Sequence, residues 1–375
     1  MSKLDELIAE HCPNGVGFSK IGDTCSITKG NTPIQKAIPG EYQLVVTTAE
    51  RKTSSSYQFD KAGVCIPLVS SRGHGVASLN EVFYQEGKYA VGNILCCVIP
   101  KDNSVLSAKF LHLYLNYAKD YLLVPQMKGG ANVSLSIDAI ARVRIPIPPL
   151  PVQNEVIAIL EKFSTHIIEL TAELTARKKQ YEYYRNLLLS SNDVEWMTLP
   201  QISTNCDRQR KPVTKGNREA GIYPYYGASG IVDYVAEYLF DGDFLLVSED
   251  GANLLARSTP IAFSISGKNW VNNHAHVLKF KTTEMQKYVE MYLNSIDLSK
   301  YISGGAQPKL NQDNLNKIPI PVPTPEKVKR IVDILLQFDT LCADMKNGLP
   351  AEIEARQKQY EYYRDKLLTF KEKEA

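Results

Sequence analysis

Basic side chains in this sequence lie in clusters, beside amide and aromatic residues. Arg and Lys neutralise phosphate groups, whereas Arg, Asn and Gln can form paired hydrogen bonds with the edges of bases. In the second half of the sequence these residues are Arg208, Arg210, Lys211, Lys215, Arg218, Tyr225, Tyr226, Asn272, Asn273 and His274. In the first half they are Lys29, Asn31, Arg51, Lys52, Arg72 and His74. We predict nucleic-acid contacts at these positions. The alternative for any single one of them is an ordinary solvated side chain.

A pair of glycines occurs at the same place in each half of the sequence. Glycine allows a positive φ and a close approach of the backbone to a ligand. The basic and amide side chains nearby suit a phosphate group or a base edge. The residues predicted to bind nucleic acid here are Lys128, Gly129, Gly130 and Asn132, and then Gly304, Gly305, Gln307 and Lys309. A plain tight turn is the competing interpretation, and the recurrence favours a nucleic-acid contact.

Signatures of catalysis are missing from the sequence. It contains no GxxxxGK[ST] motif for phosphates, no GxGxxG motif for dinucleotides and no HExxH motif for zinc. It also lacks the Asn-Pro-Pro-Tyr or Asp-Pro-Pro-Tyr motif of amino-methyltransferases and the acidic signature of nucleases. His274 and His276 would share one face of a strand, as metal ligands can, but no third ligand is visible nearby, and a structural or phosphate-facing pair is favoured. We therefore predict no catalytic residue, no metal site and no cofactor on this chain.

The composition of the chain is that of an ordinary folded protein. The chain has 375 residues, of which 44% are hydrophobic and 22% charged, and its net charge is +2. These values exclude a disordered chain and a uniformly basic coat protein, but they leave local binding of nucleic acid open. The seven cysteines form no CxxC pair, and no apolar signal or membrane-spanning run is present, so we expect a cytoplasmic protein with free thiols. Cys96 and Cys97 are expected to be small apolar residues of a buried strand.

The sequence repeats itself over its whole length. Residues 177–185 recur as residues 356–364 with eight of nine positions identical, at an offset of 179. Residues 145–148 and 318–321 share the motif Ile-Pro-Ile-Pro. Repeated blocks in the same order at a nearly constant offset indicate two copies of one unit, each with a turn-rich region, a Pro-rich connector and a long helix.

The end of each copy has the pattern of a coiled-coil helix of about 40 residues, or about 60 Å. In the first helix the seam residues are Leu160, Phe163, Ile167, Leu170, Leu174, Tyr181, Tyr184 and Leu188, with Arg177 in one polar position. In the second they are Ile331, Leu335, Phe338, Cys342, Met345, Ile353, Arg356, Tyr360, Tyr363 and Leu367. Pro350 should kink or interrupt the second helix near Asn347 and Gly348. Duplication favours pseudo-two-fold symmetry, and hence antiparallel helices.

These patterns predict an α+β fold, in which two pseudo-repeated mixed α/β domains are separated by two long antiparallel helices that form a coiled coil. The globular domains are expected at residues 1–148 and 191–322, and the long helices at residues 149–190 and 323–375. Within the first helix, Glu-Leu-Thr-Ala occurs twice in tandem, at residues 169–172 and 173–176. Each copy adds about 6 Å of helix, so this segment is either a length module or simply good helix-forming sequence.

The Ile-Pro-Ile-Pro connectors, the helices that contain Gln-Tyr-Glu-Tyr-Tyr-Arg and the Gly-Gly-Ala segments resemble the specificity subunit of type I restriction–modification enzymes. The resemblance implies that each globular domain is a target-recognition domain that reads one half of a bipartite site in double-stranded DNA. It further implies that two methylation subunits, which carry S-adenosylmethionine, dock on the helices, and that ATP- and Mg-dependent restriction subunits join them. The interruption at residues 347–350 departs from the family pattern. The residues expected at the docking sites are Tyr181, Tyr184, Arg185, Tyr360, Tyr363 and Arg364.

Two other functions compete with this interpretation. A coiled-coil scaffold that holds two protein-binding domains would show the same duplication and the same seam, but no DNA affinity that falls with rising salt. A fused methyltransferase would need a cofactor-binding domain of some 200 residues, for which the chain leaves no room.

Overall fold

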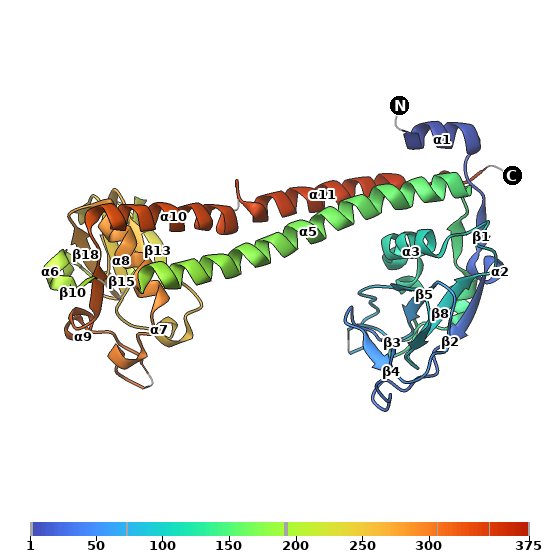
Figure 1. The fold of residues 1–375 in the computed structure, drawn as a ribbon, viewed down its shortest axis with the longest axis horizontal. Coiled ribbons are helices and arrows are strands. Elements are labelled where there is room, and N and C mark those ends of the chain that lie inside the picture. The colour runs from blue at the N-terminus through green and yellow to red at the C-terminus, as the bar shows by residue number, and fades with distance from the viewer. Residues whose placement is uncertain (1–2, 73, 191–193, 306, 345, 374–375) are drawn as a thin grey trace. The chain divides into compact units, whose positions relative to one another are not determined.

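The computed structural model describes residues 3–72, 74–190, 194–305, 307–344 and 346–373. The chain forms two compact units. Unit 1 comprises Met1–Leu170 together with Ile353–Ala375, and unit 2 comprises Thr171–Glu352. Unit 1 is therefore discontinuous in sequence, whereas unit 2 is one continuous stretch. Each unit combines sheets with helices, as the predicted α+β class requires (Figure 1).

Unit 1 is built on a four-stranded antiparallel sheet with the strand order β2-β8-β5-β6. Val64 and Ile66 of β5 share one core with helix α3, whereas Cys65 between them belongs to a second core with Tyr89 of β7. Both faces of this sheet are thus covered, because successive side chains of a strand point to opposite faces. The strands are β2 (Cys25–Lys29), β5 (Gly63–Pro67), β6 (Phe83–Gln85) and β8 (Leu95–Pro100), and α3 is Ala108–Leu122.

A second, three-stranded sheet of unit 1 has the order β4-β3-β7, in which β3 and β7 run parallel. Its strands are β3 (Tyr42–Val45), β4 (Lys52–Ser54) and β7 (Tyr89–Val91). The short strands β1 (Phe18–Lys20) and β9 (Arg144–Pro146) pair antiparallel and lead the chain into and out of the domain. The remaining helices before the long one are α1 (Lys3–His11), α2 (Ile21–Thr24), the 3-10 turn η1 (Val124–Gln126) and α4 (Ile137–Arg142).

Unit 2 repeats this plan. Its four-stranded antiparallel sheet has the order β11-β18-β15-β16, and helix α8 packs against it as α3 packs in unit 1 (Figure 1). A second sheet has the order β13-β12-β17-β14, and the pair β10-β19 corresponds to β1-β9. The strands are β10 (Glu195–Thr198), β11 (Ser203–Asn205), β12 (Ala220–Gly227), β13 (Gly230–Val235), β14 (Phe240–Asp241), β15 (Phe244–Ser248), β16 (Ala262–Ile265), β17 (Lys268–Val271), β18 (Ala275–Phe280) and β19 (Pro319–Val322).

The short helices of unit 2 complete the repeat. They are α6 (Leu199–Ile202), η2 (Asp207–Gln209), η3 (Lys215–Asn217), α7 (Asn253–Ala256), α8 (Thr283–Ser295), η4 (Ser299–Tyr301) and α9 (Gln312–Asn316). Side chains of Ser, Thr or Asn cap several helices of the two units. Ser136, Thr282 and Asn311 each accept a hydrogen bond from a backbone N–H three residues later, which satisfies one of the free donors at a helix start.

The long helix α5 (Leu150–Leu189) contributes to both units. In unit 1, Val152 and Val156 near its start share a core with Leu367 at the end of α11 (Leu349–Leu367). In unit 2, Leu189 at its end shares a core with Val328 near the start of α10 (Pro325–Ala343). In each unit, therefore, the two helices run antiparallel, as predicted.

The predicted interruption of the second helix is confirmed. Helix α10 ends at Ala343 and α11 begins at Leu349, with Pro350 in its first turn, where proline is tolerated. A Cβ on Gly348 would lie 2.6 Å from the Thr340 carbonyl oxygen and 2.8 Å from that of Asp344. Only glycine can therefore sit this close to the last turn of α10 without a shift of the backbone. The predicted seam residue Met345 lies outside the described residues.

The C-terminal segment completes the core of unit 1. Leu367 and Leu368 are buried there, and Phe370 packs edge-on against Phe110 of α3 with ring centroids 6.0 Å apart. Beyond them, the Val16 backbone N–H donates to the carbonyl of Lys371, and the N–H of Lys373 donates to the carbonyl of Val16, at 2.8 and 2.9 Å. Residues 367–373 are thus an integral part of unit 1.

All seven cysteines are buried and free. Cys96 and Cys97 lie in β8 and are fully inaccessible to solvent, as predicted for apolar residues of a strand. Burial raises the pKa of the Cys96 thiol to about 12, which keeps it protonated. Within the described ranges, no helix is both long and apolar enough to cross a membrane.

Candidate nucleic-acid interface

The two glycine pairs form the same hairpin turn in the two units. In unit 1, the backbones of Lys128 and Ser134 exchange two hydrogen bonds of 2.8 and 2.9 Å. In unit 2, Ser303 and Lys309 exchange two bonds of 2.9 and 2.7 Å. Each turn therefore spans the same number of residues and closes in the same way. Ala306, inside the second turn, lies outside the described residues.

The first glycine of each pair is required by the turn itself. The φ angle is 137° at Gly129 and 82° at Gly304, a region that L side chains rarely adopt. A Cβ on Gly129 would lie 2.2 Å from the Asn132 carbonyl oxygen, and one on Gly304 would lie 2.4 Å from that of Gln307. The tight turn therefore explains why both of these positions are glycine.

The second glycine of each pair has no such role in the turn. Neither Gly130 nor Gly305 has a positive φ, and a Cβ built on either would meet no described atom within 4 Å. Both residues are exposed at the tip of the hairpin. The absence of a side chain here leaves the backbone open to close approach by a ligand. This agrees with the second property of glycine on which the prediction of a ligand contact depends.

Other predicted residues lie beside these hairpins. In unit 1, the segment that carries Arg72 and His74 joins the hairpin through a hydrogen bond of 3.2 Å from the Gly75 N–H to the Ala131 carbonyl. In unit 2, the Gly251 N–H donates to the Pro308 carbonyl over 3.1 Å. Gly73 lies outside the described residues. The structure therefore gathers an exposed set at each hairpin, consisting of Arg72, His74, Lys128 and Asn132 in unit 1, and Asn273, His274, Gln307 and Lys309 in unit 2.

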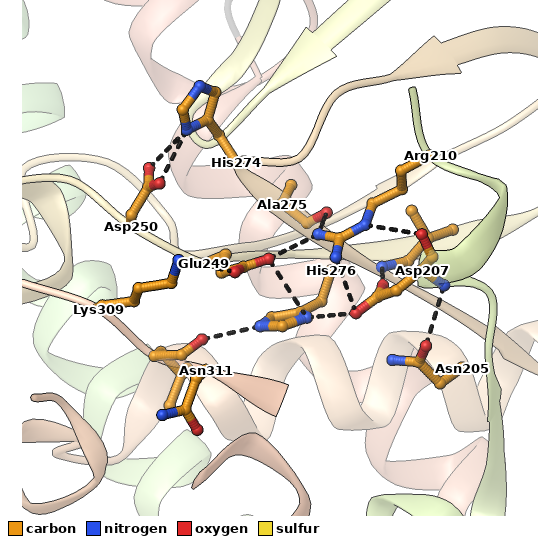
Figure 2. Close-up of polar contacts among 12 residues, drawn as sticks. Asn205, Asp207, Arg210, Glu249, Asp250, His274, Ala275, His276, Lys309 and Asn311 are labelled. Carbon is orange, nitrogen blue, oxygen red and sulfur yellow. Dashed lines mark hydrogen bonds and ion pairs between the residues drawn. The ribbon is translucent and has the colours of Figure 1, made fainter. Parts of the chain in front are cut away.

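Next to the hairpin of unit 2 lies a buried ionic cluster, shown in Figure 2. The His276 side chain is 1% exposed, and its Nδ1 lies 2.6 Å from Oδ2 of Asp207, while its Nε2 lies 2.8 Å from the carbonyl oxygen of Leu310. Both ring nitrogens thus lie within hydrogen-bond distance of oxygen acceptors. Leu310 directly follows the hairpin, which connects the histidine to the loop.

Arg210 completes the buried cluster. Its Nη1 lies 2.7 Å from Oε2 of Glu249 and 2.7 Å from the carbonyl oxygen of Ala275, and its Nη2 lies 3.3 Å from Asp207. Lys309 reaches the other oxygen of Glu249 at 3.2 Å. Burial alone would raise the pKa of Asp207, but the hydrogen bond from His276 and its charge lower that pKa below its ordinary value. The pKa of Glu249 is likewise lowered against the effect of burial, chiefly by the hydrogen bond from Arg210.

Several residues predicted to bind nucleic acid have structural roles instead, and we correct those assignments. Arg210 is fully engaged in the buried cluster. Tyr225 is 1% exposed, and its hydroxyl accepts a hydrogen bond from the Val213 N–H over 3.0 Å. Arg218 lies 4.4 Å above the Tyr225 ring and pairs with Asp233 at 3.0 Å. Asn272 is buried and accepts a hydrogen bond from the His274 N–H over 2.8 Å.

Two further predicted residues make contacts within their own unit. The Arg51 guanidinium lies 4.9 Å above the Phe83 ring and donates to Gln85 and to nearby carbonyls, so it is largely used within unit 1. Tyr226 is half-buried against Phe263, with ring centroids 6.1 Å apart. The remaining predicted residues are exposed, namely Lys29, Asn31, Lys52, Arg208, Lys211 and Lys215.

The two histidines considered as metal ligands do not share a site. His274 is half-exposed and pairs with Asp250 at 2.8 Å, whereas His276 is buried in the ionic cluster (Figure 2). Among the residues that the structure describes, no group of three or more His, Cys, Asp or Glu side chains could hold a metal ion.

The residues predicted for partner docking lie largely in the seam between helices. In unit 2, Tyr184 stacks on Phe338 with ring centroids 6.0 Å apart, and Tyr181 packs against the same ring at 6.3 Å, while Arg185 covers Tyr181. In unit 1, Tyr360 and Tyr363 pack against the core, and Arg364 lies 5.8 Å above the Tyr117 ring. Tyr183 and Tyr362, which fall outside the heptad seam, are each 63% exposed, whereas Tyr184 is 38% exposed.

Comparison with known proteins agrees with this architecture. A family model for the type I restriction modification DNA specificity domain matches twice, at residues 13–178 and 192–355. The chain is 37% identical over 189 residues to a putative type I restriction enzyme specificity subunit of Haemophilus influenzae, and that match covers 49% of each protein. It is 32% identical over 298 residues to the EcoR124I/EcoR124II specificity subunit of Escherichia coli, a match that covers 72% of each.

Solved structures show the same fold. The S subunit of a type I restriction-modification system from M. genitalium superimposes with a TM-score of 0.58 at 16% identity, covering 94% of this chain and 95% of that one. A second solved structure concerns complex assembly and conformational transition of the type I R-M system. One of its chains superimposes with a TM-score of 0.52 at 13% identity, covering 95% of this chain and 98% of that one.

Proposed function

The chain belongs to the family of type I restriction–modification DNA specificity proteins, and we propose that it recognises a bipartite sequence in double-stranded DNA without catalysing a reaction itself. One observation carries the proposal: the same hairpin, with the same unexplained second glycine, stands beside the same type of sheet in both units. Two equivalent sites on one chain suit a target of two half-sites. The globular domains at 1–148 and 191–322 would each read one half-site, and the helices at 149–190 and 323–375 would set the spacing between them.

The proposed DNA-facing surface consists of the exposed residues of the prediction. Lysine and arginine would contact phosphates and fix the orientation, and amide side chains would contact base edges. It comprises Lys29, Asn31, Lys52, Arg72, His74, Lys128, Gly129, Gly130 and Asn132 in unit 1, and Arg208, Lys211, Lys215, Asn273, His274, Gly304, Gly305, Gln307 and Lys309 in unit 2.

Catalysis is assigned to partner proteins. Two methylation subunits would supply S-adenosylmethionine and the methyl transfer, and restriction subunits would supply the ATP- and Mg-dependent reactions. Two copies of the methylation subunit agree with the duplication, because each unit offers one equivalent helix pair. Membership of the family supports this assembly.

The decisive experiment is to co-express the chain with its cognate methylation subunit and to map adenine methylation in the host genome. The expected result is one motif made of two short conserved parts separated by a fixed gap. A single uninterrupted motif, or no motif at all, would contradict the proposal. If the assembled complex also shows no DNA affinity that falls with rising salt, the coiled-coil scaffold is the better interpretation.

The two glycines of each hairpin should respond differently to alanine. Gly129→Ala and Gly304→Ala should lower the free energy of unfolding by about 1–3 kcal/mol, because each forces a side chain into a positive-φ conformation. Gly130→Ala and Gly305→Ala should change it by less than about 0.5 kcal/mol. Denaturant unfolding measures these values.

Substitution of the second glycine of each hairpin, which should hardly change stability, should instead lower the DNA affinity of the assembled complex. A Cβ at Gly130 or Gly305 should weaken binding although folding is intact, and glutamate should weaken it further by placing a carboxylate near phosphates. Wild-type affinity for both Gly130→Glu and Gly305→Glu would remove these loops from the interface.

The tandem Glu-Leu-Thr-Ala segment offers a test of spacing. One additional copy after Ala176 should lengthen the gap in the methylated motif and leave both half-sites unchanged, since four residues add about 6 Å of helix. The inserted residues are the same as those already in the tandem, and the sequence on either side of it is unchanged. Methylome sequencing reads the gap directly, and an unchanged gap would refute the spacing role of α5.

A further inference from the structure

One position beside each hairpin has the same backbone surroundings in the two units but a different side chain. In unit 1, Val69 forms an antiparallel bridge with Ser134, and in unit 2 Asp250 forms one with Lys309. Ser134 and Lys309 are the residues that close the two hairpins. Val69 and Asp250 are therefore equivalent residues, and each lies directly beside the hairpin of its unit.

Two backbone hydrogen bonds flank this bridge in each unit. They run from the Ser70 N–H to the Val133 carbonyl and from the Leu135 N–H to the Leu68 carbonyl in unit 1, over 3.0 and 2.8 Å, and from Gly251 to Pro308 and from Leu310 to Glu249 in unit 2, over 3.1 and 2.7 Å. A bridge between two such bonds is the type of pair whose side chains lie closest together, on one face of the ladder. The backbone therefore fixes the direction of Val69 and of Asp250 in the same way.

A neighbouring side chain differs between the units together with this position. Nδ1 of His274 lies 2.8 and 3.0 Å from the two carboxylate oxygens of Asp250 (Figure 2). The His274 carbonyl accepts a hydrogen bond from the Glu249 N–H over 2.8 Å, just as the Ile94 carbonyl accepts one from Leu68 over 2.9 Å. His274 is thus the counterpart of Ile94. Unit 1 has two apolar residues where unit 2 has a carboxylate and an imidazole.

The chemistry of a carboxylate restricts what it can face on DNA. Val69 is 37% exposed and the Asp250 side chain 32%, so both are accessible beside the hairpins. A carboxylate is repelled by phosphates and by the acceptor atoms of guanine and thymine, and adenine places the acceptor N7 beside its amino group. Cytosine alone presents only a donor in the major groove, its N4 amino group. An ionised carboxylate has about four acceptor sites, so the contact with His274 leaves Asp250 able to accept further hydrogen bonds.

The side chain of Val69 has the opposite character. It offers neither a donor nor an acceptor, so it cannot take part in hydrogen-bonded readout. Its favourable contact with a base edge is apolar, and the 5-methyl group of thymine is the apolar group of the major groove. The same backbone position therefore suits a different base in each unit.

We propose that this position determines one base pair of each half-site, with the Asp250 carboxylate accepting a hydrogen bond from N4 of a cytosine and Val69 packing against the 5-methyl group of a thymine. The inference rests on the proposed function, in which each unit reads one half-site. His274 is a positioning residue, because it holds the carboxylate through Nδ1. One duplicated scaffold thereby reads two different half-sites.

The test uses the full chain co-expressed with its cognate methylation subunit, with adenine methylation mapped in the host genome. The wild-type motif should contain a fixed cytosine in one half-site and a fixed thymine in the other, each preferred about tenfold or more over the other bases. Asp250→Val should abolish the preference for that cytosine and leave the second half-site unchanged. Val69→Asp should abolish the preference for the thymine and leave the first half-site unchanged.

Asp250→Asn separates the reading of a base from support of the loop. The amide keeps the shape of the side chain but both donates and accepts, which matches N6 and N7 of adenine. The preference at this base pair should therefore move from cytosine to adenine. His274→Ala should weaken the preference for cytosine at the same base pair without creating a new one. A distorted loop would instead lower methylation at all sequences and shift no preference.

Asp243→Asn is the matched control for the loss of charge. Asp243 is exposed and precedes β15, whereas Asp250 follows the same strand, so the two carboxylates belong to opposite ends of it. The substitution changes the net charge of unit 2 by the same amount. It should reproduce the wild-type motif, because Asp243 is remote from the hairpin.

Three outcomes would overturn the inference. A bipartite motif that stays the same in Asp250→Val and Asp250→Asn would remove Asp250 from base reading and leave the proposed function standing. Loss of all methylation in both Asp250 variants, with Asp243→Asn still active, would assign Asp250 to the structure of the loop. A wild-type motif without two separated parts would overturn the proposed function as well.

Discussion

Asp207→Asn is expected to lower the free energy of unfolding of unit 2 by about 3–5 kcal/mol, the range observed when one partner of a buried ion pair is removed. The substitution keeps the shape of the side chain but removes its charge. The His276 and Arg210 side chains would then share the single carboxylate of Glu249. The Val277 N–H, which donates to Asp207 over 2.7 Å, would keep an acceptor, so the loss reports mainly on charge.

Tryptophan fluorescence during denaturant unfolding measures this effect in one unit. Both tryptophans of the chain, Trp196 and Trp270, belong to unit 2, so their signal follows that unit alone. Asp233→Asn is the matched control, because it removes the same charge from a more exposed pair with Arg218 and should cost less than about 1 kcal/mol. An equal loss of unfolding free energy in the two variants would show that burial of the cluster contributes nothing to the stability of unit 2.

The cluster also predicts how stability depends on pH. The pKa values of Asp207 and Glu249 are lower in the folded unit than in an unfolded chain. Their contribution is therefore fully present above the unfolded values and is lost as the pH falls below about 4, through the lowered folded pKa values. Asp207→Asn should flatten this acid limb of the stability curve. A wild-type curve that rises on acidification would contradict the assignment.

Deletion of residues 367–375 is expected to unfold unit 1 while unit 2 stays folded. The deletion removes two buried leucines and the ring of Phe370 from the core. Truncating a single buried leucine typically costs about 2–5 kcal/mol, so the combined loss exceeds the stability of many domains. It also removes the backbone hydrogen bonds that join Val16 to Lys371 and Lys373.

Hydrogen exchange measured by mass spectrometry distinguishes the two units in one sample. Peptides from β5 and β8 of unit 1 should lose protection, whereas peptides from β15 and β18 of unit 2 should keep it. Glu372→Ala serves as the control, since it removes only the exposed pair with Arg144 and should leave protection unchanged. Unchanged exchange in β5 and β8 after the deletion would mean that the C-terminal segment is dispensable for the fold.

The duplicated architecture followed from the sequence because its signals are local or periodic. Each of these signals lies within a few turns of helix. They are the nine-residue repeat, the positions of Phe163 and Phe338 in the seam, and Pro350 shortly after a glycine. The sequence placed both glycine pairs in possible turns, and the structure shows those turns, but the separate roles of the two glycines depend on φ and on what surrounds each Cβ. Those properties appear only in three dimensions.

The individual binding residues were harder to predict, since a basic residue in a turn-rich segment has the same sequence pattern whether it faces solvent or a buried carboxylate. Arg210 pairs with Glu249, 39 residues away, and His276, which lies 3.9 Å from the same carboxylate, comes from a third segment. Tyr225 lies in an exposed-looking run of tyrosines, yet the stacking of Trp270 buries it. Whether each side chain faces solvent or the interior depends on its direction in the folded unit, which the sequence of the segment alone does not reveal.

The division of unit 1 between the two ends of the chain has a consequence for synthesis. A ribosome releases residues 171–352 before α11 is complete, so unit 2 can fold while the apolar stripe of Val152, Val156 and Leu160 is still uncovered. The domain that is made first is therefore finished last, when Leu367 and Leu368 arrive. Until then the nascent chain carries an exposed helix face of the kind that aggregates or recruits chaperones, and a stop codon after α5 but before Leu367 leaves that face open.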